Sequence, residues 1–237
     1  MSRGAYLLEL GNVPYLEALE LQRSLAGAVS QGAIPDTVVF LEHPPVVTLG
    51  RRTDEGELHV PEGTDVEVVE TDRGGKSTYH APGQLVCYPI LDLKRHGQDV
   101  KRYCRDLEEA LVKTLAAFSL KGERIEGLTG VWMPRPPRKI ASIGIHISKW
   151  VATHGYALNV DLDPAPFTDW ITACGLEDAA FTTMARELGR PLTVEDVRPA
   201  AVDALAEVFD LSFEELPAGE GTGLWPQPRH ASLAPSR

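Results

Sequence analysis

Residues 73–93 read RGGKSTYHAPGQLVCYPILDL, a glycine-rich segment that leads into a long apolar run. The run QLVCYPILDL at 84–93 predicts a β-strand, because it is rich in β-branched and aromatic residues and follows a glycine. Before it stand three shorter runs punctuated by Pro and Gly: TVVFLEH (37–43), VVTLG (46–50) and VEVVE (66–70). We expect all four runs to be strands of one sheet.

Helical patterns lie on both sides of these runs. A strand is predicted at 5–10 and a helix at 13–31, which has a proline in its first turn. The clearest amphipathic helix is predicted at 99–118, where apolar residues recur on one face. Three further strands are predicted at 130–133, 139–147 and 152–162. This mixture, without regular βαβ alternation, favours an α+β fold, a mixed β-sheet flanked by helices.

The second half is predicted to be a helical cap from about residue 167 onward. Its strongest helix, 193–209, begins with Thr193 as N-cap, and Pro199 should kink this helix or shift its start. Residues 217–237 contain four Pro and three Gly and predict an irregular C-terminal tail. Residues 1–216 are then expected to form a single domain.

Charge and cysteine content narrow the class of protein. The chain has 237 residues, 23 basic and 34 acidic, so its net charge of −11 disfavours nucleic acid or an anionic membrane as partner. Three cysteines without paired spacing predict neither a disulfide framework nor a zinc cluster, and suggest a reducing, cytoplasmic compartment. No run reaches the 18 or so apolar residues that a membrane span needs.

Three segments carry side chains suited to chemistry. In the first, residues 73–84, glycines let backbone N–H groups approach a ligand, while Arg73, Lys76, Tyr79 and His80 offer donors. The alternative is a glycine-rich hairpin with exposed polar residues. The segment does not have the spacing of a Walker phosphate loop.

The other two segments each contain one candidate. Lys139 begins the apolar run KIASIG and shares a strand face with Ala141 and Ile143, so its ammonium can lie along a buried groove; most such lysines are simply solvated. Cys174, in TACG, has polar and glycine neighbours, an environment that favours thiolate. Cys87 and Cys104 lie in an apolar run and in a predicted helix, where cysteine usually serves as a small hydrophobe.

Together with HPPVVTLGR (43–51), these segments resemble the lipoyl-carrier octanoyltransferases, the LipB family. The blocks RGG, TYH, PGQLV, KIA, HGYALNV and Cys-Gly occur in order over roughly residues 6–190, and the match includes Tyr15, Gln22 and 130–132. Ala81 stands where this family usually has Gly. Ala173 replaces the usual Pro before the cysteine, a change that can loosen the loop without removing the thiol.

The resemblance implies the catalytic-domain fold of biotin and lipoate protein ligases over residues 1–216. It also implies an ATP-independent acyltransferase that takes octanoyl from octanoyl-acyl carrier protein and holds it as a cysteine thioester. The group then passes to a specific lysine of a lipoyl domain, the first step of endogenous lipoate synthesis. The implied acceptors are the lipoyl domains of 2-oxoacid dehydrogenase E2 subunits and the glycine cleavage H protein. No metal and no cofactor are implied.

The resemblance also assigns residues. Cys174 falls at the nucleophile and Lys139 at the lysine that activates it. The positions implied to contact the acyl substrate are Arg73, Gly74, Gly75, Lys76, Ser77, Thr78, Tyr79, His80, Ala141, Ser142, Ile143, His154, Gly155 and Tyr156. Chemistry supports the pair, because a thiol with a pKa near 8.5 attacks as thiolate and a nearby cation stabilises that form. Candidates for the wall of an acyl pocket are Leu85, Val86, Ile140, Ile143 and Ile145.

Other activities remain open from the sequence. An ATP-dependent lipoate or biotin ligase would need an adenylate-binding loop and no nucleophilic cysteine. An amidotransferase would move octanoyl between lipoyl domains, and a Cys-His thioesterase would use His80 or His154 as base. A catalytically silent acyl-binding module is the alternative of another class.

One further run is unusual in an acidic chain. Residues 94–105, KRHGQDVKRYCR, contain five basic side chains and one acidic one, which gives a local charge of +4 and leaves −15 elsewhere. A patch of this kind can dock an acidic carrier protein. The alternative is a solvated helix face whose cations near a helix N-terminus need compensation.

Overall fold

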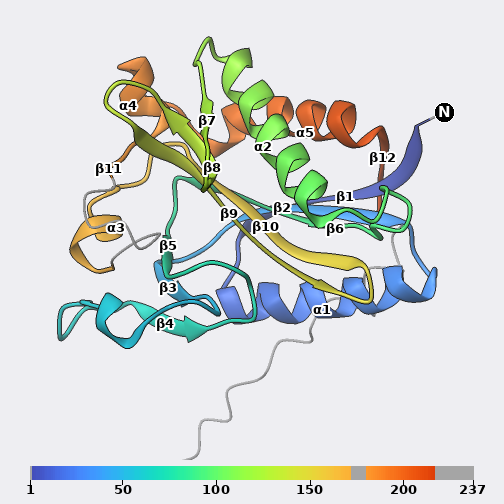
Figure 1. Cartoon of the computed structure of the whole chain (residues 1–237), viewed down its shortest axis with the longest axis horizontal. Coiled ribbons are helices and arrows are strands. Elements are labelled where there is room, and N and C mark those ends of the chain that lie inside the picture. The colour runs from blue at the N-terminus through green and yellow to red at the C-terminus, as the bar shows by residue number, and fades with distance from the viewer. Residues whose placement is uncertain (1, 172–179, 217–237) are drawn as a thin grey trace, which may run out of the picture.

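The computed structural model of the chain describes residues 2–171 and 180–216 (Figure 1). Within these residues a nine-stranded mixed sheet forms the centre, with the order β12-β1-β2-β6-β10-β9-β8-β7 and with β11 paired to β9. Its strands are β1 (Arg3–Asn12), β2 (Asp36–Glu42), β6 (Gln84–Ile90), β7 (Glu123–Ile125), β8 (Leu128–Met133), β9 (Arg138–Ser148), β10 (Val151–Asn159), β11 (Ala180–Phe181) and β12 (Leu211–Glu215).

A second, smaller sheet packs beside the first. It contains β3 (Val46–Leu49), β4 (Glu67–Glu70) and β5 (Thr78–His80), in the order β4-β3-β5. The prediction that the runs at 46–50 and 66–70 belong to the same sheet as 37–43 and 84–93 is therefore wrong. The reason is local, because His43-Pro44-Pro45 separates β2 from β3 and a proline cannot donate to a continuing strand ladder.

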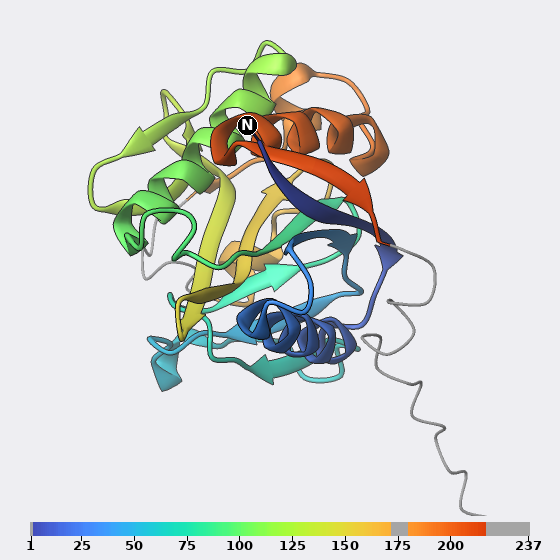
Figure 2. The ribbon, with the colours of Figure 1, turned by 90° about the vertical axis from the view of Figure 1, so that its right-hand side faces the viewer.

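Helices cover both faces of the central sheet. They are α1 (Tyr15–Gln31), α2 (Val100–Ala117), α3 (Pro166–Asp169), α4 (Met184–Leu188) and α5 (Val194–Phe209), with a short 3-10 turn at Glu55–Glu57. Figure 2 shows α1 on one side of the sheet and α2 with α5 on the other. In β2 the side chains alternate accordingly: Val38 and Phe40 join the core under α2 and α5, whereas Val39 and Leu41 join the core under α1.

The helix starts follow their capping residues. The Asp99 carboxylate accepts hydrogen bonds from the N–H groups of Lys101 and Arg102 and so compensates the cations in the first turn of α2. Thr193 is the N-cap of α5, as predicted, and it also forms a capping box with Asp196. Pro199 lies inside α5 without shifting its start, which remains at Val194.

The predicted helical cap after residue 167 is only partly correct. Two segments in it are strands: β11 pairs with β9, and β12 pairs in parallel with β1, at the edge of the sheet shown in Figure 2. The predicted tail at 217–237 lies outside the described residues. Among the helices that are described, none is both long and apolar enough to cross a membrane.

Candidate active site

A cavity of about 370 Å³ lies against the strands β6, β9 and β10, within the 300–1,000 Å³ typical of small-molecule sites. The loop before β5, the β7–β8 hairpin and one residue of α2 close its sides. The lining includes Tyr15, Arg52, Arg73–Thr78, His80, Val86, Tyr88, Cys104, Gly127–Thr129, Trp132, Lys139, Ser142–Ile145 and His154–Ala157.

The loop at 73–77 is held by its own arginine. The buried guanidinium of Arg73 donates to the carbonyl oxygen of Thr48 (2.6 Å) and to its Oγ1 (2.7 Å), and on its other side to the carbonyl oxygen of Lys76 (2.7 Å). The N–H of Gly74 donates to the carbonyl oxygen of Ile145 in β9, with 2.8 Å between N and O. Arg73 therefore ties the glycine-rich loop to the small sheet, while Gly74 ties it to the large one.

Lys139 lines the cavity and is buried, with 4% of its surface exposed. Its Nζ lies 5.3 Å from the centre of the Trp132 ring, a cation–π contact between paired residues of β9 and β8. Gly130 makes room for this side chain. A Cβ there would lie 2.8 Å from Lys139 Cε and 2.5 Å from the carbonyl oxygen of Ala141.

The described chain resumes next to this lysine at Ala180. Residues 172–179, and Cys174 with them, lie outside the described residues. The chain enters that segment after Ile171, and at Ala180 and Phe181 it pairs in parallel with Arg138 and Lys139. The N–H of Thr182 also donates to the carbonyl oxygen of Lys139 (3.0 Å). Ala180 and Phe181, which lie six and seven residues after Cys174, are thus paired with the strand that carries Lys139.

Two histidines line the cavity as buried bases. Burial is the main cause that holds the pKa of His80 well below its usual range, and the neighbouring His43 is the second cause. The Nδ1 of His80 lies 2.7 Å from Gln84 Oε1. Burial also lowers the pKa of His154, although its Nε2 lies 2.9 Å from a carboxylate oxygen of Asp72. The hydrogen bond to His154 is the main reason that the pKa of Asp72 is depressed.

Ser77 and Trp132 line the cavity, and each has a buried side-chain polar atom. Among the described residues, neither Ser77 Oγ nor Trp132 Nε1 has a hydrogen-bond partner. Buried polar atoms are seldom left unpaired in native proteins. Polar groups of a bound ligand would supply these atoms with hydrogen-bond partners.

Gly155 is required by its position. A Cβ on this residue would collide with the carbonyl oxygen of Cys87 in the adjacent strand β6. Because glycine has no Cβ, β10 can approach β6 closely at this point, between the lining residues His154 and Tyr156.

Comparison with known proteins identifies the fold and the family. The model of the family described as "Lipoyl protein ligase A/B catalytic domain" matches residues 14–206. An octanoyltransferase of Chloroflexus aurantiacus is 45% identical over 207 residues, 85% of this chain and 92% of the relative. An octanoyltransferase of Mycobacterium tuberculosis is 46% identical over 229 residues, 96% and 93% of the two chains. The chain belongs to the octanoyltransferases of this family.

Solved structures confirm the fold predicted for an octanoyltransferase. A bi-partite lipoate protein ligase of Thermoplasma acidophilum has a TM-score of 0.76 at 17% identity, with 94% of this chain and 90% of that chain covered. A lipoate-protein ligase A bound with ATP has a TM-score of 0.73 at 18% identity, with coverage of 94% and 92%. At these identities the likeness concerns the fold alone.

Most positions that the octanoyltransferase resemblance assigned to the substrate come together around the cavity. Two do not line it: Tyr79 points the other way from β5 and packs edge-on against Phe167 and Trp170, and Ala141 is part of the core. Lys76 lines the cavity, but its ammonium pairs with Asp54 (2.9 Å) and with Glu57. These two carboxylates raise the pKa of Lys76, Glu57 more than Asp54.

The predicted pocket wall is correct only in part. Val86, Ile143 and Ile145 line the cavity, whereas Leu85 and Ile140 are buried in the core on the other side of their strands. The sequence did not predict that Cys104 and residues 127–129 line the cavity. By its spacing Cys104 falls on the same apolar stripe of α2 as Val100 and Leu107. The period of 3.6 does not show which members of a stripe face the core and which line a cavity.

Proposed function

We propose that this octanoyltransferase moves an octanoyl group from octanoyl-acyl carrier protein, through a thioester on Cys174, to a lysine ε-amine on lipoyl domains. Its membership of the family makes it an acyltransferase. The acceptors proposed are the lipoyl domains of 2-oxoacid dehydrogenase E2 subunits and the glycine cleavage H protein, and the compartment is the cytoplasm.

The observation that carries this proposal is the placement of Lys139. This residue lines a cavity together with Val86, Ile143 and Ile145, and its backbone is bonded to the chain just after the cysteine segment. An apolar wall suits an alkyl chain, since each buried methylene contributes about 0.8 kcal/mol. An ammonium beside the sulfur favours the thiolate that must attack.

The steps balance with these two side chains. The Cys174 thiolate attacks the donor thioester carbonyl, the bond to the carrier sulfur breaks, and the Lys139 ammonium gives its proton to the departing thiolate. Neutral Lys139 then takes a proton from the acceptor amine as that amine attacks the enzyme thioester. The Cys174 thiolate leaves, the amide is formed and Lys139 is again an ammonium. Thioester exchange followed by amide formation needs no ATP.

Intact-mass measurement tests the proposal. Incubation with octanoyl-acyl carrier protein should add one octanoyl group to the protein, and an apo lipoyl domain should then remove that group as its own mass increases. Cys174→Ser should abolish both events. Cys87→Ser and Cys104→Ser are the matched controls and should retain them. An adduct on Cys87 or Cys104, or release of free octanoate in place of transfer, would contradict the proposal.

A further inference from the structure

Four exposed cations around the start of α2 have no acidic partner among the described residues: Lys94, Lys101, Arg105 and Lys149. We call them the α2 basic surface. The other two basic residues of this run differ, because Arg95 pairs with Asp36 and Asp92, and Arg102 pairs with Asp106. Asp99 uses its carboxylate to cap α2. The structure thus separates the compensated cations of the run from those available to a partner.

Lys149 joins this surface through the β9–β10 turn. The N–H of Leu93 donates to the carbonyl oxygen of Trp150 (2.8 Å), which fixes the turn beside the segment that leads to Lys94. Two large apolar side chains are exposed here, Val100 at 42% and Trp150 at 38%. Apolar side chains with a charged rim are typical of a protein–protein interface.

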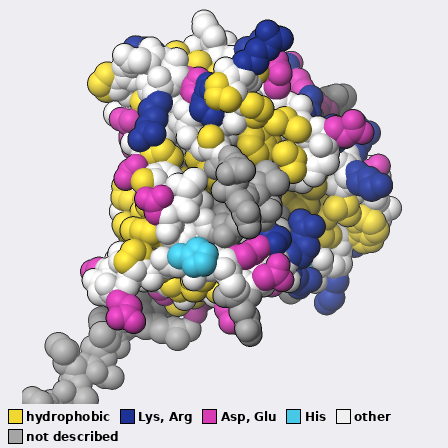
Figure 3. All heavy atoms as spheres, turned by 60° about the vertical axis from the view of Figure 1, so that its left-hand side comes forward, with side chains coloured by type: hydrophobic (Ala, Val, Ile, Leu, Met, Phe, Trp, Pro, Cys, Tyr) yellow, Lys and Arg dark blue, Asp and Glu magenta, His cyan; other side chains and the backbone are white. Residues whose placement is uncertain are grey.

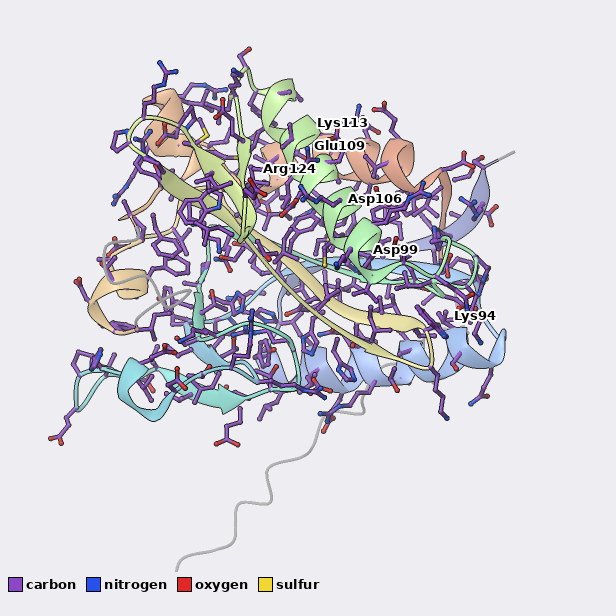
Figure 4. All side chains as sticks on the ribbon, viewed as in Figure 1. Lys94, Asp99, Asp106, Glu109, Lys113 and Arg124 are labelled. Carbon is purple, nitrogen blue, oxygen red and sulfur yellow. The ribbon has the colours of Figure 1, made fainter. Side chains whose placement is uncertain are left out.

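The α2 basic surface has a distinct position in the molecule. Figure 4 shows Lys94 and Asp99 where the loop enters α2, with Glu109 and Lys113 farther along the helix. Figure 3 shows the side of the molecule that carries α3 and α4, where acidic and basic side chains are intermixed.

This surface borders the cavity. Cys104 lines the cavity from α2, and Lys101, three positions earlier, is its neighbour on the helix surface. A partner bound at α2 is thus placed beside the lining of the cavity.

We propose that the α2 basic surface docks an acidic protein, and that this protein is the acyl-carrier donor; this rests on the proposed function. An acidic partner is repelled by the rest of the chain, which carries −15, and attracted here. Acyl carrier proteins are acidic as a class, so the charge of this surface matches the donor. The lipoyl domain is the other candidate partner, and the experiment below separates the two.

The test is the double variant Lys101→Glu/Arg105→Glu. Its KM for octanoyl-acyl carrier protein should increase about tenfold or more, with kcat retained, and wild-type kcat/KM should fall steeply with added salt. Turnover with a small octanoyl thioester, and KM for the lipoyl domain, should stay within about twofold. The milder Lys101→Ala/Arg105→Ala should show the same selectivity with a smaller effect, so a folding defect of the first variant does not decide the matter.

The matched control is Lys113→Glu/Lys121→Glu, which changes the net charge equally at the other end of α2 and beyond it. Both lysines are in exposed ion pairs, with Glu207 and Glu123, and the control should leave KM for the carrier unchanged. An equal loss with both donors, a selective loss for the lipoyl domain, or no loss at all would overturn the docking proposal. Failure of the wild-type protein with the small thioester as well would instead reject the proposed function.

Discussion

Lys139 owes its position to a glycine on the neighbouring strand. Gly130 has φ +115°, a region that side chains disfavour, and it precedes the point between Val131 and Trp132 where β8 changes register against β9. Its N–H donates to Glu108 Oε1 of α2 (3.2 Å), and the other oxygen of this buried carboxylate pairs with Arg124 Nε (3.3 Å). A charged pair between helix and hairpin therefore fixes the backbone against which the lysine lies.

Gly130→Ala should damage catalysis through Lys139. The new Cβ would come within 2.8 Å of Lys139 Cε, so the ammonium must move, and the positive φ adds strain of about 1–3 kcal/mol. We expect a fall in kcat of about tenfold or more with a small octanoyl thioester, and slower alkylation of Cys174 by iodoacetamide at neutral pH. Steady-state kinetics and mass-resolved alkylation measure the two effects.

Gly63→Ala is the control for strain alone, since Gly63 has φ +80° but no atom within 4 Å of an added Cβ. It should lower stability without changing kcat. If Gly130→Ala retained wild-type kcat and alkylation rate while losing stability like the control, the positioning role of Gly130 would be rejected.

The sequence predicts some of these residues and misses others for a physical reason. Lys139 stands out because it begins an apolar strand, and Arg73 because it opens a glycine-rich run. Glu108 looks like an exposed helix residue from its sequence, yet it is buried, because the β7–β8 hairpin folds over α2. Contacts between distant segments leave no local pattern.

At the scale of elements, the loop at 73–77 is held in place by the Arg73 fork, as the hydrogen bonds to Thr48 and Lys76 show. Holding this loop needs a planar donor with several N–H groups. The Arg73 guanidinium donates at the same time to two oxygen atoms of Thr48 in β3 and to the carbonyl oxygen of Lys76 in the loop. The loop in turn brings Ser77 and the backbone of Gly74 and Gly75 to the cavity.

Arg73→Lys should therefore loosen the loop although the charge is kept. An ammonium cannot reproduce the fork, so we expect a loss of about 1–3 kcal/mol in the free energy of unfolding and a severalfold higher KM for octanoyl thioesters. Urea unfolding and kinetics measure the two quantities. Arg23→Lys, on the exposed side of α1, is the matched control and should change neither. Unchanged stability and KM in Arg73→Lys would show that the fork is dispensable.

Elements with strong local periodicity were predicted within a few residues: 99–118 against α2 at Val100–Ala117, and 193–209 against α5 at Val194–Phe209. Short strands were not. β12 exists because Leu211–Glu215 pair with Arg3–Leu7, about 200 positions away, and β11 has only two residues. Their conformation comes from partners in the sheet, which composition and spacing do not reveal.

Across the whole molecule, buried rings connect α1, β5 and β6 beneath the cavity. The His43 ring lies 5.1 Å from that of Tyr15 and 5.6 Å from that of His80. His43 Nδ1 donates to the carbonyl oxygen of Val13 (2.6 Å), so in the neutral ring Nε2 accepts from the hydroxyl of Tyr88 (2.6 Å). Both ring nitrogens of His43 have a hydrogen-bond partner, and the neutral form of the ring satisfies both hydrogen bonds.

This arrangement makes the stability of the fold depend on pH. Burial lowers the pKa of His43 from 6.5 to about 4, against a smaller opposing effect of the Val13 carbonyl. Between these two values the unfolded chain binds a proton that the folded chain does not, so the free energy of unfolding falls as pH falls through this window. At pH 4.5 the loss from His43 alone is roughly 2–3 kcal/mol, and His80, whose pKa is also lowered, adds to it.

His43→Gln should flatten this dependence, because an amide can donate to Val13 and accept from Tyr88 without titrating. We expect the slope of unfolding free energy against pH between about 4.5 and 6 to fall by about 1 kcal/mol per pH unit, as measured by urea unfolding at several pH values. His59→Gln removes an exposed histidine and should leave the slope unchanged. If His43→Gln kept the wild-type slope, the acid sensitivity would have to arise elsewhere, with His80 and His154 as the next buried imidazoles to replace.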